Sequence, residues 1–309
     1  MGEILKEYKD FKCGYVSIIG YPNAGKSTLL NAILGEKVAI VTPKPQTTRN
    51  NITGILTKDN YQIIFLDTPG IHKNNKKFNK NLINIALSSL NHTDIVYFII
   101  DSKKGIPENS EKIFIEILSK VKQPIFLLLN KIDLVSQDSI NKLENKYCNL
   151  IEIKEVLKIS AKKNENLDIL IEKTVKYLPE SPPLYPKDYL STQTDRFFAE
   201  EVIREKAFLY LKKELPYSIA VQVEEFKERN NGTIYILAFI YVEHPSQRKI
   251  VIGEGGKMLK KIGESARKEL EICFNAKIFL ELWVKVKRNW TKNDRFLKEF
   301  GYFAYKRKI

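Results

Sequence analysis

Short apolar runs recur along the first half of the chain and predict buried strands. These runs are residues 15–19, 62–66, 94–100 and 124–129. Three segments between them carry apolar side chains at helical spacing, residues 27–34, 78–90 and 108–121. Apolar strands that alternate with helices are typical of a doubly wound, mostly parallel sheet with helices on both faces. We therefore predict an α/β domain whose ligands bind at the carboxyl ends of the strands.

The pattern changes in the second half. Residues 197–213 have helical spacing, and three strand-like runs follow at residues 219–226, 233–242 and 277–286. This order predicts a smaller α+β domain. Between the halves, residues 178–186 contain four prolines and predict a stiff, extended linker. We expect five parts: an N-terminal extension (1–12), an α/β domain (13–178), a linker (179–195), an α+β domain (196–288) and a basic tail (289–309).

Charge and cysteine content indicate which partners and which cellular compartment suit the protein. The chain has 309 residues, enough for two cores, and a net charge of +14. Residues 245–309 hold 17 Lys and Arg against 7 Asp and Glu, a net charge of +10. Such a segment is typical of proteins that meet phosphate backbones or anionic membranes, although it also fits a merely solvated surface. Three isolated cysteines and no long apolar run predict a cytoplasmic protein.

One octapeptide predicts a nucleoside triphosphate site. It matches the phosphate-binding loop GxxxxGK[ST] between a predicted strand and helix, and it comprises Gly20, Tyr21, Pro22, Asn23, Ala24, Gly25, Lys26 and Ser27, with Thr28 next. The glycines let backbone N–H groups converge on the β-phosphate, and Lys26 supplies charge to the β- and γ-phosphates. Ser27 offers its hydroxyl to Mg²⁺.

A second motif follows the strand at residues 62–66. Alone it is an ordinary turn sequence, Asp67, Thr68, Pro69 and Gly70. After a strand, and in a chain with a phosphate loop, Asp67 can support the magnesium shell and Gly70 can turn its N–H toward the γ-phosphate. The next residue, Ile71, is apolar and cannot orient an attacking water, and the lone His72 beside it is more typical of a solvated side chain. We therefore expect slow intrinsic hydrolysis.

A third motif selects the base. It follows the strand at residues 124–129 and consists of Asn130, Lys131, Ile132 and Asp133. The carboxylate of Asp133 can accept hydrogen bonds from N1–H and the exocyclic amino group of guanine, whereas adenine presents no such pair of donors. Asn130 and Lys131 would brace the base and the phosphate loop. Ser160 and Ala161, after the next strand, would close the purine pocket.

These motifs in this order resemble translation-factor-type GTPases. Residues 45–49 resemble the first switch of the TrmE-Era-Der group. The resemblance implies GTP and GDP as ligands and Mg²⁺ held by Ser27, Thr48 and Asp67, with Thr47 as second choice for the switch threonine. It also implies that Asn23 helps to hold a potassium ion in place of an arginine finger. We hypothesise K⁺ activation because Asn23 is present and Ile71 stands where a glutamine is expected. The candidate catalytic residues are Lys26, Asn23, Thr48 and Gly70.

A GxxG loop lies in the second domain. It consists of Gly253, Glu254, Gly255 and Gly256 and is followed by Lys257, Lys260 and Lys261. Such a loop lets the backbone approach a sugar-phosphate chain while the adjoining groove holds about four nucleotides. The order of elements resembles a type II KH domain, which implies RNA binding. The variable pair of this loop is commonly basic in the family, and Glu254 places a repulsive charge there instead.

Residues 14–302 as a whole resemble the Era family of ribosome-associated GTPases. The resemblance implies a monomer that binds small-subunit ribosomal RNA near its 3′ end and acts in assembly of the small ribosomal subunit.

Two other classes stay open. One is an RNA-binding assembly chaperone whose nucleotide is largely structural. The other is a GTPase bound weakly at the inner face of the cell membrane through Trp283 and Trp290, although Trp283 alternates with apolar residues and is expected in the core.

Overall fold

The computed structural model describes residues 8–71, 77–90 and 92–302, with side chains in the second range from residue 83 onward. His72, the first seven residues of the predicted N-terminal extension and the last seven of the predicted tail lie outside them. The described chain divides into two compact units. One comprises residues 8–39 and Thr48–Thr192, and the other comprises Ile40–Thr47 and residues 193–302.

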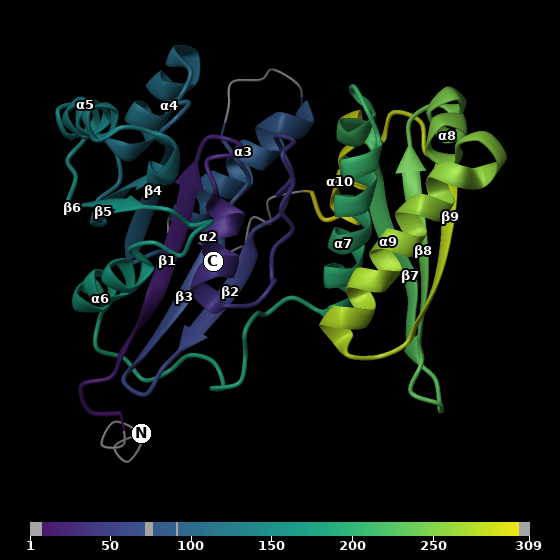
Figure 1. Cartoon of the computed structure of the whole chain (residues 1–309), viewed down its shortest axis with the longest axis horizontal. Helices are drawn as coiled ribbons and strands as arrows, with labels where there is room; N and C mark the ends of the chain where they lie inside the picture. Colours follow the sequence, from purple (N-terminus) through teal and green to yellow (C-terminus); the bar gives the residue numbers. More distant parts are fainter. Residues whose placement is uncertain (1–7, 72–76, 91, 303–309) are drawn as a thin grey trace. The chain divides into compact units, whose positions relative to one another are not determined.

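The first unit is built on a six-stranded sheet (Figure 1). Its strands are β1 (Lys12–Gly20), β2 (Ile52–Thr57), β3 (Tyr61–Asp67), β4 (Ile95–Asp101), β5 (Ile125–Asn130) and β6 (Glu155–Ile159). Their order is β2-β3-β1-β4-β5-β6, and every neighbouring pair is parallel except β2 with β3. The predicted α/β fold is confirmed. The edge strand β2 is not predicted, because Gly54 and two threonines interrupt its apolar pattern.

Helices cover both faces of this sheet. They are α2 (Lys26–Leu34), α3 (Lys77–Leu90), α4 (Glu108–Leu118), α5 (Gln137–Cys148) and α6 (Leu167–Tyr177). On one face, α3, α4 and α5 pack against alternate residues of β4 and β5 in a continuous core. On the other, Tyr177 of α6 packs edge-to-face against Phe126 with ring centroids 5.2 Å apart. Consequently the carboxyl ends of β1, β3, β4 and β5 remain open to a ligand.

The proline-rich segment contains no helix after Tyr177 and hydrogen-bonds along the first unit. The carbonyl of Pro179 accepts from the N–H of Cys13 at 3.1 Å. The side-chain oxygen of Gln62 accepts from the N–H groups of Leu184 and Tyr185 at 2.8 and 3.0 Å. This part of the linker is therefore held by the unit that precedes it.

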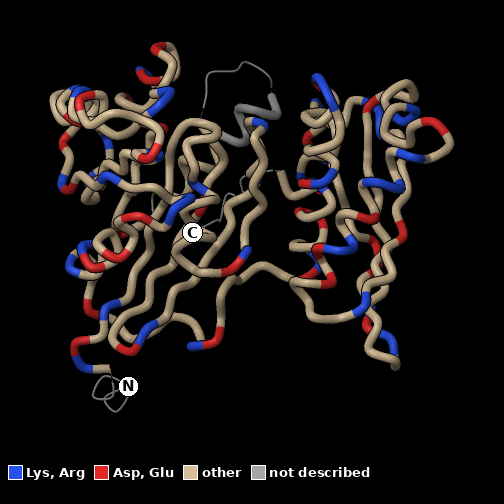
Figure 2. The backbone as a smooth tube through the Cα atoms, viewed as in Figure 1, with Lys and Arg blue, Asp and Glu red and all other residues tan. Residues whose placement is uncertain are grey.

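The second unit is a three-stranded sheet with helices packed on one face (Figure 1). Its elements are α7 (Asp195–Tyr210), β7 (Ala220–Glu228), β8 (Ile234–Val242), α8 (Pro245–Ile252), α9 (Lys257–Phe274), β9 (Ile278–Val286) and α10 (Asp294–Glu299). The strand order is β7-β8-β9, antiparallel and then parallel. Lys and Arg recur along this unit, including α9 and β9 (Figure 2).

Two features of this unit differ from the sequence-based picture. Part of the predicted tail is folded, since α10 lies in it and Trp290 is fully buried beside Phe300 and Tyr302. The prediction that Trp283 lies in the core is wrong, because 55% of its surface is exposed. Alternation along β9 is real, but Leu282 and Val284 face the helices and Trp283 faces the opposite side.

The described helices include none that is both long enough and apolar enough to cross a bilayer.

Candidate nucleotide and RNA sites

Two positions of the phosphate-binding loop require glycine, because neighbouring atoms lie too close to leave room for a Cβ. Gly25 has φ 106°, and a Cβ there would lie 2.2 Å from the side-chain nitrogen of Asn130. A Cβ on Gly20 would lie 2.4 Å from the carbonyl oxygen of Ile99. The loop therefore passes between the ends of β4 and β5 with no room for side chains at these points.

Lys26, at the start of α2, is buried under the loop. Its ammonium donates to the carbonyls of Gly20 at 3.1 Å and Tyr21 at 3.2 Å. Burial lowers the pKa of Lys26 to about 8, and the carboxylate of Asp67 opposes part of that shift. The charge that a phosphate needs is thus held in place before any ligand arrives.

We expect the affinity for GDP without Mg²⁺ to fall above about pH 8, by up to about tenfold per pH unit. Above that pKa the free protein carries neutral Lys26, and binding a phosphate must take up a proton. The guanine ring loses its N1 proton in the same alkaline range, so Lys26→Arg, which stays charged, is the reference. Fluorescence titrations of both proteins would test this. The same pH dependence of GDP affinity in the wild type and in Lys26→Arg would contradict this expectation.

Ser27, Thr48 and Asp67 bring oxygens together beside Lys26. The Ser27 hydroxyl donates to Asp67 Oδ2 at 2.5 Å and lies 2.9 Å from Thr48 Oγ1. Thr48 Oγ1 also donates to the same carboxylate oxygen at 3.5 Å. Asp67 is fully buried, and burial raises its pKa to about 6. Its other oxygen, Oδ1, is buried without a hydrogen-bond partner among the described residues.

This set of groups fits Mg²⁺. The ion prefers oxygen ligands and usually keeps water or phosphate in several positions, so two hydroxyls and one carboxylate suffice on the protein side. A divalent cation would also compensate the buried carboxylate and engage its unpaired oxygen. Thr47 does not share the set, since its hydroxyl contacts Thr42 Oγ1 at 2.6 Å and the Lys44 carbonyl at 2.7 Å.

The turn after Asp67 is pressed against the phosphate-binding loop. Thr68 is buried and donates to the carbonyl of Ile18 at 2.8 Å. A Cβ on Gly70 would lie 2.8 Å from backbone atoms of Pro22. Pro69 is buried between them, and Ile71 is fully buried with its N–H directed to the Gly20 carbonyl at 3.3 Å. Ile71 is thus a core residue that presents no group to water.

The base-selecting motif joins the loop through Asn130. Its side chain donates to the Ala24 carbonyl at 2.8 Å and accepts from the Ala161 N–H at 3.0 Å. Asp133 Oδ1 accepts from the Ser160 hydroxyl at 2.7 Å, and this hydrogen bond lowers the pKa of Asp133. The carboxylate is therefore held as an ionised double acceptor. The half-buried Ile132 packs at the edge of the adjacent core.

Lys131 has a partner that the sequence reasoning missed. Its ammonium donates to the Asn23 carbonyl at 2.8 Å and to Asp101 Oδ2 at 2.6 Å. Asp101 ends β4 as Asp67 ends β3, so the position of an acidic residue at a strand end was the available signal. These two hydrogen bonds hold the aliphatic part of the Lys131 side chain across the phosphate-binding loop, where a purine ring can pack against it.

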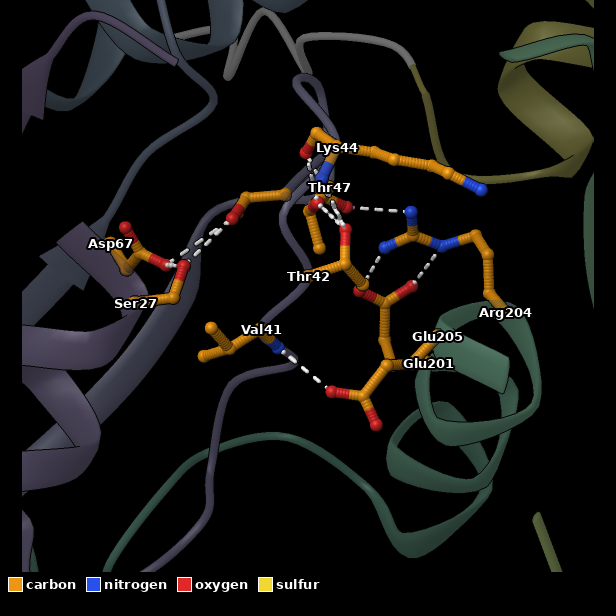
Figure 3. Close-up of polar contacts among 10 residues, drawn as sticks. Ser27, Val41, Thr42, Lys44, Thr47, Asp67, Glu201, Arg204 and Glu205 are labelled. Carbon is orange, nitrogen blue, oxygen red and sulfur yellow. Dashed lines mark hydrogen bonds and ion pairs between the residues drawn. The ribbon is translucent and has the colours of Figure 1, made fainter. Parts of the chain in front are cut away.

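The stretch Ile40–Thr47, which includes the first part of the predicted switch at residues 45–49, packs on α7 within the second unit (Figure 3). The Val41 N–H donates to Glu205 at 2.9 Å, and the Arg204 guanidinium donates to the Thr47 carbonyl at 2.6 Å. Arg204 is almost fully buried and also pairs with Glu201. The Lys44 ammonium donates to the last carbonyls of α7 and beyond, where a helix favours positive charge.

The GxxG loop joins α8 to α9. Gly253, Gly255 and Gly256 have φ of 76°, 56° and 78°, and a Cβ on Gly253 would lie 2.7 Å from that of Met258. Glu254 and Lys257 are exposed. Lys260 is exposed and 3.9 Å from Glu264, while Lys261 lies over the ring of Tyr210 at 4.4 Å. The turn therefore offers backbone and lysine charge together at the start of α9.

The α/β unit with its phosphate and base motifs, followed by a GxxG unit, defines a P-loop GTPase with a KH domain. Residues 15–131 match the 50S ribosome-binding GTPase family, and residues 214–291 match the KH domain family. The chain belongs to the Era family of GTPases.

Relatives match over almost the whole chain. GTPase Era of Ruminiclostridium cellulolyticum is 44% identical over 94% of this chain and 98% of the relative. GTPase Era of Geotalea daltonii is 46% identical over 95% of this chain and 99% of the relative. Two solved structures each cover 95% of this chain and all of the other with a TM-score of 0.89. One is a single-residue variant of Aquifex aeolicus Era bound to GDP and AlF₄⁻, 38% identical, and the other, 39% identical, is Era in complex with MgGDPNP and nucleotides 1506–1542 of 16S ribosomal RNA.

Proposed function

We propose that this protein is a GTP-hydrolysing switch that binds small-subunit ribosomal RNA near its 3′ end and acts in assembly of the small ribosomal subunit. The observation that carries the nucleotide-switch part of the proposal is the convergence of Ser27, Thr48 and the buried Asp67 carboxylate. The solved Era structures with MgGDPNP, GDP and 16S ribosomal RNA support it.

The roles of the nucleotide residues follow from the geometry. Lys26 stabilises charge on the β- and γ-phosphates, and Ser27, Thr48 and Asp67 hold Mg²⁺, which supplies charge neutralisation at the phosphates. Gly70, where a Cβ would lie 2.8 Å from Pro22 of the phosphate-binding loop, would turn its N–H toward the γ-phosphate. Asp133 selects guanine because its two acceptors match two donors on that base.

The stretch Ile40–Thr47 provides the link to the RNA-binding unit. Thr48 follows Thr47 directly, and the carbonyl of Thr47 accepts a hydrogen bond from Arg204 on α7. Holding Thr48 at the metal therefore constrains a residue bonded to the KH unit, and hydrolysis releases that constraint.

We expect K⁺ to accelerate hydrolysis severalfold or more over Na⁺ at equal ionic strength. Ile71 is in the core and cannot orient water, so transition-state charge needs another source. A monovalent cation near Asn23 would supply it. Phosphate release in the two salts, for the wild type and for Asn23→Ala, is the measurement. Equal rates in K⁺ and Na⁺ would remove the cation hypothesis.

Replacing Glu254 by lysine is expected to tighten RNA binding and to steepen its salt dependence. The side chain is exposed within the GxxG loop, so the change turns a repulsive charge into an attractive one. Glu172→Lys, at an exposed position of α6 in the first unit, is the matched control for net charge alone. Binding of single-stranded RNA would be measured at several salt concentrations. No difference between Glu254→Lys and wild type at low salt would place Glu254 outside the interface.

An RNA-binding chaperone with a structural nucleotide is the second candidate, and the burial of Ile71 favours it. Single-turnover hydrolysis with and without small ribosomal subunits separates the two. A switch hydrolyses GTP faster on its target, or binds the subunit differently with GTP and GDP. Identical rates and affinities in every arm would favour the chaperone.

We propose that the protein works in the cytoplasm, which is supported by its three cysteines, since none of them forms a disulfide. We also propose that it is a monomer. Weak attachment to the inner face of the cell membrane is the finer alternative. Flotation with anionic vesicles tests it.

A further inference from the structure

Within the described residues, one face of the KH sheet is left uncovered by α7, α8 and α9. The helices α7, α8 and α9 pack on the side that carries Ile236, Ala238, Ile240 and Val284. Opposite them lie the alternate residues of β8 and β9, namely Tyr235, Leu237, Phe239, Tyr241, Phe279, Glu281, Trp283 and Lys285. We call these eight residues the open face.

Only one end of the open face is covered by the described chain. There Tyr241 packs against Phe300 with ring centroids 5.0 Å apart, and Tyr241 is 9% exposed. Phe279, at the other end, is 52% exposed, and Trp283, between the two ends, is 55% exposed. Two large rings on an edge strand thus present about half of their surfaces to solvent.

Basic side chains accompany these rings. Tyr235 and Phe279 are stacked with centroids 5.9 Å apart, and the Arg229 guanidinium lies 4.9 and 5.4 Å from the two centroids. Lys285 places its ammonium 3.3 Å from the centroid of Phe239, which is the cross-strand neighbour of Trp283. Cations therefore lie beside both exposed aromatic positions.

Glu281 holds the rings in place. Its Oε1 accepts from the indole N–H of Trp283 at 2.7 Å, and its Oε2 accepts from the Tyr235 hydroxyl at 2.9 Å. Both carboxylate oxygens are used between neighbours on the same face. An aromatic surface that is already oriented loses little entropy when a flat ligand stacks on it.

We propose that the open face is a second contact for single-stranded RNA, with bases stacked on Phe279 and Trp283 and phosphates near Arg229 and Lys285. Exposed rings on a sheet with interleaved cations are the features by which single strands are bound through stacking and charge. The two rings are four strand positions apart, about 13 Å, so they would receive different bases. This inference rests on the proposed RNA-binding function and extends it beyond the GxxG loop.

Two observations favour RNA over a second copy of the chain. Arg229 and Lys285 lie beside the rings, and the one acidic side chain among the eight residues, Glu281, is already engaged by Trp283 and Tyr235, so a phosphate chain complements this face better than an identical surface would. In addition, both α8 and α9 pack against β9, the edge strand, so an RNA bound at the GxxG loop can continue around this edge to the open face.

The test uses the full chain and a mixed-sequence single-stranded RNA of about 12 nucleotides, within the range that such surfaces occupy. We expect Trp283→Leu and Phe279→Leu each to weaken binding about tenfold, because leucine keeps an apolar side chain but removes the stacking surface. RNA should also quench tryptophan fluorescence in the wild type and not in Trp283→Leu, since Trp290 is fully buried. A duplex of the same length should not quench.

Three controls make the result decisive. Ile272→Ala removes a side chain that is 81% exposed on α9 and should leave affinity unchanged. Lys257→Glu tests the GxxG loop separately. Lys285→Gln, which leaves every ring intact, should make the dependence of affinity on salt shallower by about one phosphate contact.

The outcomes separate the two proposals. Wild-type protein that binds no RNA overturns both. RNA binding that is weakened by Lys257→Glu but is unchanged by both leucine substitutions, without quenching, overturns the open-face inference alone. A change in oligomeric state on sedimentation, with RNA affinity unchanged, overturns it in favour of a second copy.

Discussion

Asp133→Asn is expected to weaken GDP binding about 10³-fold and to reverse the preference in favour of xanthine nucleotides. The carboxylate offers two acceptors to two guanine donors, and the Ser160 hydroxyl fixes its orientation at 2.7 Å. An asparagine amide would place one donor against the exocyclic amino group, which leaves buried donors unpaired. Xanthine carries a carbonyl at that position and accepts from the amide.

Competition of GDP, XDP and ADP against a fluorescent nucleotide measures this reversal. Asp138→Asn, on an exposed position of α5, is the matched control and should keep the wild-type order. If Asp133→Asn still prefers GDP to XDP, Asp133 does not contact the base edge.

Arg204→Met should lower the free energy of unfolding of the second unit by about 3–5 kcal/mol. Arg204 is 1% exposed and is the buried partner of the Glu201 carboxylate, with its Nε donating to Oε1 at 2.8 Å. Methionine would leave that carboxylate charged in the interior, and the Thr47 carbonyl would lose its donor at 2.6 Å. Urea unfolding followed by circular dichroism gives the loss.

The double substitution Glu201→Leu/Arg204→Met tests the cause. It removes both charges, so most of the lost stability should return, although the Thr47 carbonyl stays unpaired. Arg196→Met, exposed in the first turn of α7, should change stability little. If the double variant is as unstable as the single one, lost packing rather than a stranded charge is responsible. Hydrogen exchange of residues 40–47 should rise in Arg204→Met.

The sequence was most informative where function fixes the local backbone. The phosphate-binding loop needs Gly20, Gly25, Lys26 and Ser27 at set spacing, and the structure places them between β1 and α2. Parallel strands bring their carboxyl ends to one edge, which explains why residues distant in the chain, such as Asp67 and Ser27, meet.

Other features depend on information that spacing does not carry. Arg204 and Thr47 are 157 positions apart, and nothing in either neighbourhood marks them as partners. Alternation along β9 shows that two faces differ but not which of them the helices cover, and for this reason Trp283 was misplaced. The fold of residues 290–302 depends on aromatic contacts with Tyr241, across the sheet.

The membership of Ile40–Thr47 in the second unit has a consequence for anyone who separates the domains. A fragment that begins at Gln193 would contain α7 and the whole KH sheet, yet it would lack the chain that gives Arg204 its carbonyl and Glu205 its N–H donor. Conversely, a fragment that ends at Thr192 would carry this stretch without its support. Each fragment would therefore lack the hydrogen bonds between residues 40–47 and α7. Mixing the two fragments would allow these hydrogen bonds to form again.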